Sequence, residues 1–160
     1  MSRLRAESVD APAAIALLNE YMAFRADGFP GGGYQRSPAD ASAFVPPVGV
    51  FLVFTDDDGV DVGCGGVRRI EAPAGTGVVR FEVKHLYMRA SARGSGGGSA
   101  LLAGLEERAR GFGATELVLD THHSLDAAGR LYARAGFTAI AAYNDNPNAT
   151  VWLRKSLKRD

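Results

Sequence analysis

The stretch ASARGSGGGSALLAGLEERARG, residues 90–111, places four glycines within five positions and then continues as an apolar and charged segment with helical periodicity. A glycine cluster directly before a helix can be a flexible linker, a dinucleotide-binding turn, a nucleotide phosphate loop or a cradle for another phosphate. The residues on either side of the cluster decide between these four interpretations, and with them the class of fold.

Two of the four interpretations conflict with the neighbouring residues. A nucleotide phosphate loop of the Walker type ends in lysine followed by serine or threonine, and no lysine follows any of these glycines. A linker is also excluded, because periodic structure is expected immediately before and immediately after the cluster.

The dinucleotide interpretation comes closer to a match but is disfavoured. Residues 94–99 read GSGGGS, one residue short of the G-x-G-x-x-G fingerprint, and Asp120 ends the next expected strand, where a ribose-binding acid would lie. The unit begins in the middle of a short chain, however, which leaves no room for the second parallel half of a doubly wound sheet. The strand before it also belongs to an expected antiparallel meander.

Read from Arg93, the same residues have the spacing Arg-x-x-Gly-x-Gly, with the helix beginning at Gly98. Backbone N–H groups in such a turn point inward, and the helix dipole adds partial positive charge at its first turn. Glycine lets phosphate oxygens approach the backbone, because a Cβ atom would hold them off. The spacing therefore favours a pyrophosphate cradle, with Arg93 adding charge at its rim.

The composition limits the classes of function. The chain has 160 residues, of which 46% are hydrophobic and 22% charged, as expected for one globular domain over residues 1–160. Eighteen basic and eighteen acidic residues cancel, so nothing indicates nucleic acid or an anionic membrane as a partner. The single cysteine, Cys64, excludes an internal disulfide, and no signal peptide or membrane span is recognisable, so we expect a cytoplasmic protein.

The expected elements follow one another as in a single α+β domain. A helix over 9–29, with Asp10 as its N-cap, leads into a loop over 29–47 that is long enough to shape a substrate site. Three antiparallel strands, the helix after the glycines, a buried parallel strand, a helix with Ser124 as its N-cap, and two final strands come next. Their ranges are 48–56, 60–72, 77–90, 98–113, 115–121, 124–137, 137–143 and 150–157.

The strand before the glycines has two different faces if its side chains alternate regularly. One face is apolar and is expected to join the core, and the other is charged at its start and apolar at its end. The first face holds Val79, Phe81, Val83, His85 and Tyr87, and the second holds Arg80, Glu82, Lys84, Leu86 and Met88.

Two motifs around one strand carry a family resemblance. EVKHLYMRASARGSGGGSALL, residues 82–102, resembles motif A of the GNAT acyltransferase superfamily, [QR]-x-x-G-x-[GA] after a strand of the LYV type. AAGRLYARAGF, residues 127–137, is similar to motif B, A-x-x-L-Y-x-x-x-G-F, and GCGGV, residues 63–67, to a strand that leads toward the acceptor site. The resemblance implies a mixed, mostly antiparallel sheet of six to seven strands flanked by about four helices, and splayed after the motif A strand.

The resemblance implies acetyl-CoA as co-substrate and no metal. In the superfamily, the pantetheine arm pairs with exposed backbone in the gap between the two splayed strands, and the pyrophosphate lies on the motif A turn. The implied cofactor-binding residues are Leu86, Tyr87, Met88, Arg93, Gly94, Ser95, Gly96, Gly97, Gly98, Ser99 and Tyr132.

Catalytic roles follow from the same resemblance. The backbone N–H of Met88 would stabilise an oxyanion. Tyr132 occupies the motif B tyrosine, whose phenol can protonate the departing thiolate, although its helical spacing also suits a core position. Glu82 matches a frequent position of the general base. The open alternative is a salt bridge with Arg80 or Lys84.

A few positions complete the expectations. His85 is an alternative base on the opposite face of the strand from Glu82, whereas the His122-His123 pair and Cys64 are expected to bind no metal and form no acyl-enzyme. Leu125 stands where many relatives carry an asparagine that contacts CoA, which puts that one contact in doubt. The NDNPN turn near the end is either a hairpin turn or a wall of the acceptor pocket.

The function implied is transfer of an acetyl group from acetyl-CoA directly to a small-molecule amine, in a protein that can form a homodimer. A non-catalytic module that binds or senses acyl-CoA is the alternative. The candidate acceptor-binding residues come from the first helix and the long loop, and they are Tyr21, Arg25 and Tyr34.

Overall fold

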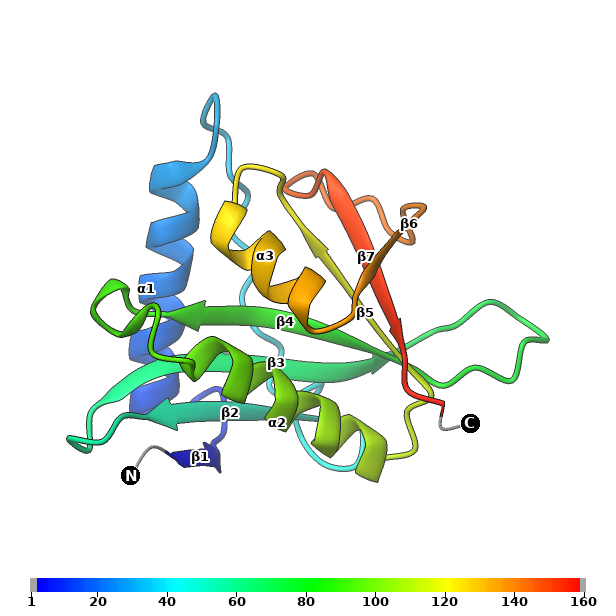
Figure 1. Ribbon diagram of the computed structural model, residues 1–160, viewed down its shortest axis with the longest axis horizontal. Coiled ribbons are helices and arrows are strands. Elements are labelled where there is room, and N and C mark those ends of the chain that lie inside the picture. The colour runs from blue at the N-terminus through cyan, green and yellow to red at the C-terminus, as the bar shows by residue number, and fades with distance from the viewer. Residues whose placement is uncertain (1–2, 159–160) are drawn as a thin grey trace.

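Seven strands form one sheet in the computed structural model, which describes residues 3–158 (Figure 1). Their order across the sheet is β1-β2-β3-β4-β5-β7-β6. All neighbours are antiparallel except β4 and β5, which run parallel, so the sheet is mixed and mostly antiparallel, as expected. The strands are β1 (Arg3–Ala6), β2 (Gly49–Thr55), β3 (Asp61–Ile70), β4 (Arg80–Met88), β5 (Glu116–Thr121), β6 (Thr138–Ile140) and β7 (Val151–Ser156).

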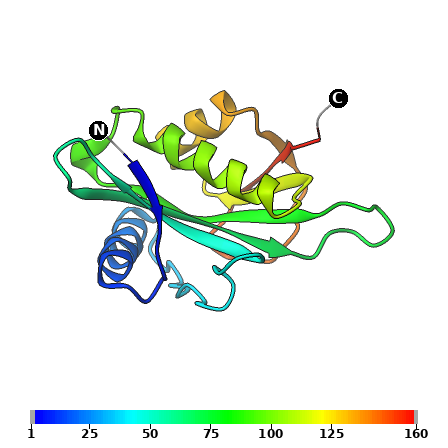
Figure 2. The same cartoon turned by 90° about the horizontal axis from the view of Figure 1, so that it is seen from below.

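Helices cover both faces of the sheet. Figure 2 shows α1 on one face and α2 together with α3 on the other. There are three α-helices in the described part of the chain, one fewer than expected, and none of them is long and apolar enough to cross a membrane. The helices are α1 (Pro12–Gly28), α2 (Gly97–Gly111) and α3 (Asp126–Arg134), with a short 3₁₀ turn at Ala90–Ala92.

The two layers of helix produce two cores, which explains the apolar run of β2. All seven residues of β2 are buried. Val50 and Leu52 point into the core under α2, whereas Phe51 and Val53 point into the core under α1. A strand enclosed on both faces needs apolar residues at every position, so it does not alternate with polar ones.

A β-bulge interrupts β4 at His85, whose φ of 59° is the only positive value among the described non-glycine residues. The pairing of β3 with β4 shifts register between Cys64 and Gly66, opposite this point. A bulge inserts one unpaired residue, and the side chains beyond it therefore change faces.

The prediction of one continuous core face along residues 79–87 is therefore wrong beyond Val83. Phe81 and Val83 pack into the core under α2, as expected. After the bulge, Leu86 and Met88 pack against that same core, whereas Tyr87 packs against the core under α1. The face predicted to hold Arg80 to Met88 changes from charged to apolar residues. This change is the feature of the sequence that reflects the bulge.

Two local predictions at element ends also fail, and one strand was not expected. The first helix begins after Ala11 and not at Asp10, and α3 has Leu125 as its N-cap because the Ser124 hydroxyl is hydrogen-bonded to His122 Nδ1 (2.7 Å). Strand β1 was not expected, since Arg3–Ala6 contains a single large apolar residue. Its pairing with β2 is supported by Arg5, which binds the Asp61 carboxylate with two hydrogen bonds of 2.8 Å.

Candidate active site

The site begins where β4 and β5 separate. The two parallel strands pair only over three positions, from Arg80 opposite Glu116 to Glu82 opposite Val118. Further along, the Arg89 N–H donates to the Val62 carbonyl oxygen (2.8 Å) on β3. Because the peptide groups of an antiparallel strand alternate in direction, those of the preceding residue, Met88, face away from β3 and into the gap.

The glycine turn lies at one end of this gap. Gly96 precedes α2 in the left-handed conformation (φ 87°), and its carbonyl oxygen accepts the first helical bond, from Ala100 (3.1 Å). The first N–H groups of a helix have no acceptor inside the helix and can bind an anion. A Cβ added at Gly97 would lie 2.5 Å from Met88 Cε and 3.1 Å from the Phe54 ring, so a larger residue here would require these side chains to shift.

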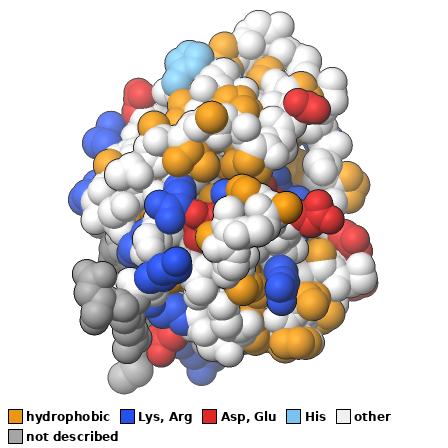
Figure 3. All heavy atoms as spheres, turned by 90° about the vertical axis from the view of Figure 1, so that its right-hand side faces the viewer, with side chains coloured by type: hydrophobic (Ala, Val, Ile, Leu, Met, Phe, Trp, Pro, Cys, Tyr) orange, Lys and Arg blue, Asp and Glu red, His pale blue; other side chains and the backbone are white. Residues whose placement is uncertain are grey.

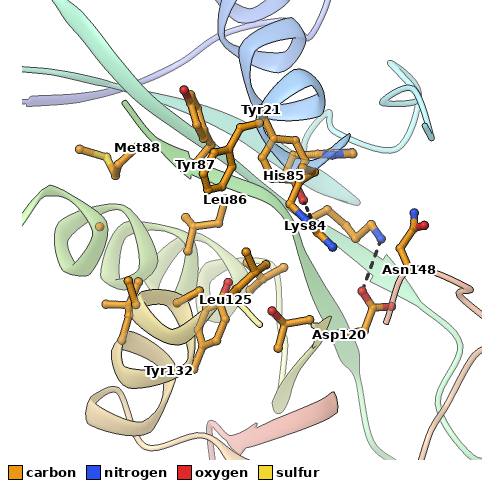
Figure 4. A pocket seen from close by; sticks show the side chains of 18 of the residues that line it. Tyr21, Lys84, His85, Leu86, Tyr87, Met88, Asp120, Leu125, Tyr132 and Asn148 are labelled. Carbon is orange, nitrogen blue, oxygen red and sulfur yellow. Dashed lines mark hydrogen bonds and ion pairs between the residues drawn. The ribbon is translucent and has the colours of Figure 1, made fainter. Parts of the chain in front are cut away.

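A cavity of about 1150 Å³ extends from this turn along β4 to α1 and the long loop (Figure 4). It is larger than the usual pocket for one drug-sized ligand, as two substrates side by side would require. Among the predicted residues, Ser95, Gly97 and Glu82 do not line it. Those that line it are Tyr21, Arg25, Tyr34, Leu86, Tyr87, Met88, Arg93, Gly94, Gly96, Gly98, Ser99 and Tyr132.

Tyr132 belongs both to the core and to the cavity. It is buried, and its ring makes an edge contact with Phe137 (centroids 5.9 Å apart). Figure 4 shows its side chain reaching from α3 toward the end of β4 where Leu86 lies. Burial raises the pKa of the Tyr132 phenol, so the hydroxyl stays protonated and can donate a proton.

Glu82 is fully engaged on the other side of β4. Arg68 donates to its Oε1 (2.9 and 3.1 Å) and the Tyr143 hydroxyl donates to its Oε2 (2.7 Å). The salt bridge considered from the sequence therefore exists, but its partner is Arg68 and not Arg80 or Lys84. Register explains this, because Arg68 lies directly opposite Glu82 in the β3–β4 ladder.

His85, at the bulge, lines the cavity between aromatic rings. Tyr21 and Phe44 lie 5.8 and 5.9 Å from its ring, centroid to centroid. Burial, with smaller contributions from Lys84 and Arg68, lowers the pKa of this imidazole to about 4. The ring is therefore neutral near pH 7 and a weak base.

The far end of the cavity is polar. The NDNPN turn as a pocket wall was one of two alternatives from the sequence, whereas Lys84 and Asp120 were not expected there. Asp120, at the end of β5, accepts hydrogen bonds from Asn144 (2.7 Å) and Asn146 (3.1 Å), and Lys84 Nζ lies 3.9 Å from its Oδ1 (Figure 4). Asn148 also lines the cavity, so the NDNPN turn is a wall of it. The three asparagines of that turn were the feature of the sequence that indicated a polar wall.

Residues 3–158 contain no group of three His, Cys, Asp or Glu side chains that could hold a metal ion. His122 and His123 stack on each other (4.4 Å), and their Nδ1 atoms contact the hydroxyls of Ser124 and Thr150. Burial raises the pKa of the Cys64 thiol to about 12, which keeps it protonated and unreactive.

Surface charge is mixed where a whole face can be seen. On the face in Figure 3, basic and acidic side chains both occur and no large field of one sign is visible. This agrees with the balance of eighteen basic and eighteen acidic residues in the sequence.

A parallel pair that splays, a glycine turn at the start of the next helix and a cavity joining them define an acyltransferase fold of the GNAT type. The chain belongs to the Acetyltransferase (GNAT) family, whose model matches residues 15–137. The fold of this family implies acetyl-CoA as co-substrate, and the lining of the cavity by the glycine turn and the open side of β4 suits such a molecule.

Individual relatives agree with this assignment. An uncharacterised N-acetyltransferase of Schizosaccharomyces pombe is 34% identical over 102 residues, which are 64% of this chain and 60% of the yeast protein. A Klebsiella pneumoniae structure described as an acyl-CoA N-acyltransferase is 27% identical, with a TM-score of 0.77 over 99% of both chains. A GNAT-family acetyltransferase of Staphylococcus aureus Mu50 has a TM-score of 0.79 at 15% identity, over 99% of this chain and 100% of the other.

Proposed function

We propose that this protein is an N-acetyltransferase that moves the acetyl group of acetyl-CoA directly to the amine of a small molecule. The observation that carries the proposal is the cavity lined at one end by Gly96 and Ser99, in its middle by Met88 and Tyr132, and also by Tyr21 on α1. A cavity of this kind can hold a phosphate-bearing carrier and an acceptor at the same time. Membership of the GNAT family supports the acyl-CoA-dependent reaction.

Two groups of this chain serve the transfer step. The neutral acceptor amine bonds to the thioester carbonyl carbon and the carbon–sulfur bond breaks. The nitrogen releases one proton to water in the cavity, and the thiolate takes up one proton, so the protons balance. The Met88 N–H, facing the gap, donates to the carbonyl oxygen while negative charge develops there. Tyr132 supplies the proton to the departing sulfur, because its side chain lines the cavity together with Met88, and it regains a proton from water.

Glu82 enters the proposal as a positioning residue. Both of its oxygens are occupied, and it acts on the cavity through Arg68, which does line it. Glu82→Gln separates this role from that of the predicted base. Positioning leaves the shape of the kcat pH profile unchanged and raises the acceptor KM, whereas removal of a base abolishes the acidic limb of that profile.

The test of the proposed function is release of free thiol from acetyl-CoA over a panel of small amines, with the acetylated product identified by mass spectrometry. We expect turnover of at least one class of amine at a rate that saturates with both substrates. Acetyl-CoA binding with no turnover of any amine would favour the alternative, an acyl-CoA-binding module. A melting-temperature shift with NAD(H) and none with CoA would contradict both.

A further inference from the structure

Arg25 presents an unsatisfied charge to the cavity. It lies in the last turn of α1 and lines the cavity, and its Nη2 atom is buried without a hydrogen-bond partner. Its Nη1 donates to the Tyr21 hydroxyl (3.3 Å), and its guanidinium lies over the Tyr34 ring, 5.1 Å from the centroid. No acidic side chain of residues 3–158 forms an ion pair with it.

Arg25 as a whole is half-buried, and only its Nη2 atom is enclosed. A buried N–H without a hydrogen-bond partner costs free energy, so a ligand oxygen that binds it is favoured. The ring of Tyr34 and the hydroxyl of Tyr21 hold the guanidinium in place but leave its charge uncompensated. Nη2 has almost no accessible surface, so an anion in the cavity would have to draw the guanidinium toward it to bind this atom. Such an anion would compensate the charge, since guanidinium groups match carboxylates in shape and charge.

The other charged residues at this end of the cavity also favour a negatively charged ligand. Lys84 faces Asp120, and Arg68 is paired with Glu82, so two of the cations are balanced within the protein. Arg36 also lines the cavity and forms no ion pair within the described residues. The acceptor end therefore carries an excess of positive charge, centred on Arg25.

The wall that carries these groups is held in place. Asn148 joins the long loop to the β6–β7 turn through two hydrogen bonds with the backbone of Gln35, one accepted from its N–H (3.0 Å) and one donated to its carbonyl oxygen (2.7 Å). Tyr34 is thereby fixed next to Arg25. A site that is ordered before its ligand arrives binds that ligand with less loss of conformational entropy.

We infer that the acceptor is a small amine that carries a carboxylate, and that Arg25 binds this carboxylate while the amine points toward Met88. The inference rests on the proposed acetyl transfer and specifies its substrate class. We assign a carboxylate and not a phosphonate because it is the smaller and planar anion, and the guanidinium is already enclosed by the Tyr34 ring and the Tyr21 hydroxyl.

The experiment compares amino acids with their carboxamides and with aminoalkyl phosphonates, in the wild type, in Arg25→Gln, in Arg25→Lys and in Arg69→Gln. Arg69 is exposed on β3 outside the cavity, so its variant controls for the loss of one positive charge. Two readouts are taken: kcat/KM for acetylation, and binding of the same compounds in the presence of CoA by calorimetry.

We expect the wild type to prefer the acid over its amide. Arg25→Gln should lower kcat/KM for the acid about 10- to 100-fold, the value of a charge-assisted hydrogen bond, and leave that for the amide unchanged. Arg25→Lys should recover part of the loss, and Arg69→Gln should behave as the wild type. An unchanged melting temperature and CoA affinity show that each variant is folded.

The outcomes separate the two proposals. Turnover without preference for the carboxylate, or a preference that survives Arg25→Gln, overturns the inference and leaves acetyl transfer standing. Carboxylate binding that needs Arg25 but leads to no turnover retains the anion site and removes the transfer reaction. Preference for the phosphonate over the carboxylate overturns the choice of carboxylate, and no binding or turnover of any compound contradicts both proposals.

Discussion

At the scale of single residues, Tyr132 is the side chain whose hydroxyl can be tested with least disturbance. Tyr132→Phe keeps the ring contact with Phe137 and removes only the proton donor. We expect kcat to fall about 100-fold or more, the usual loss when a general acid is removed, with CoA affinity unchanged. Steady-state kinetics and calorimetric titration with CoA measure the two quantities. A kcat equal to that of the wild type would remove the acid from the mechanism.

His85 predicts how stability depends on pH. Its pKa is about 4 in the folded protein against 6.5 for a free imidazole, so the unfolded chain binds the proton more tightly. The part of the free energy of unfolding that depends on neutral His85 is fully present above pH 6.5. It is lost as the pH falls from 6.5 toward 4. Between pH 7 and pH 4.5 we expect the wild type to lose about 2 kcal/mol more than His85→Asn.

Urea unfolding at the two pH values tests this expectation. Asparagine is the chosen substitute because it tolerates the positive φ of the bulge better than most residues. Equal pH dependence in the two proteins would show that His85 does not titrate abnormally.

At the scale of elements, the start of α2 is where we propose that the pyrophosphate of CoA binds. Gly96 has φ 87°, and a Cβ added there would meet no protein atom within 4 Å. Gly96→Leu therefore strains the backbone, and its side chain would extend from the turn where the pyrophosphate is proposed to bind. We expect CoA affinity to fall about tenfold or more, because the leucine side chain would occupy space that the phosphates need.

Gly111→Leu at the other end of α2 is the matched control. Gly111 has no positive φ and no neighbour within 4 Å of an added Cβ, so this variant should keep wild-type CoA affinity. Calorimetric titration of both variants with CoA decides the question. If both bind CoA equally well, the glycine turn is not the phosphate site.

At the scale of the whole molecule, Asn148 connects two segments more than a hundred residues apart in the sequence. Asn148→Ala removes both hydrogen bonds to the Gln35 backbone, and we expect it to lower stability by about 1–3 kcal/mol and to raise the acceptor KM. The CoA affinity should not change, because the glycine turn lies at the other end of the cavity.

Gln35→Ala is the control for this prediction, since it removes a side chain while keeping the backbone groups that Asn148 binds. Thermal unfolding and steady-state kinetics with the acceptor are compared in the two variants. Because Gln35 also lines the cavity, the decision rests on unfolding: an equal loss of stability in the two variants would mean that the loop is not held by Asn148.

The end of the cavity that the glycine turn and Tyr132 line could largely be predicted from the sequence. The glycine spacing after Arg93 and the tyrosine at 132 are local patterns, and a turn or a helix start depends mainly on neighbouring residues. The acceptor end was harder to predict, because it is assembled from α1, the long loop, β5 and the β6–β7 turn. Arg25 was named as a candidate from the sequence. That no acidic side chain of residues 3–158 pairs with it is a property of the packed molecule.

The bulge at His85 shows the same division within one strand. Regular alternation predicts the faces of β4 correctly up to Val83, and the positive φ at His85 then moves Leu86 and Met88 to the opposite face. Local sequence determined the order of most elements and the glycine turn, because these depend on short-range backbone geometry, and its two motifs identified the family. Tertiary structure alone decided that Arg68 pairs with Glu82 and that Arg25 stays unpaired, because charges far apart in the chain meet only through sheet register and loop packing.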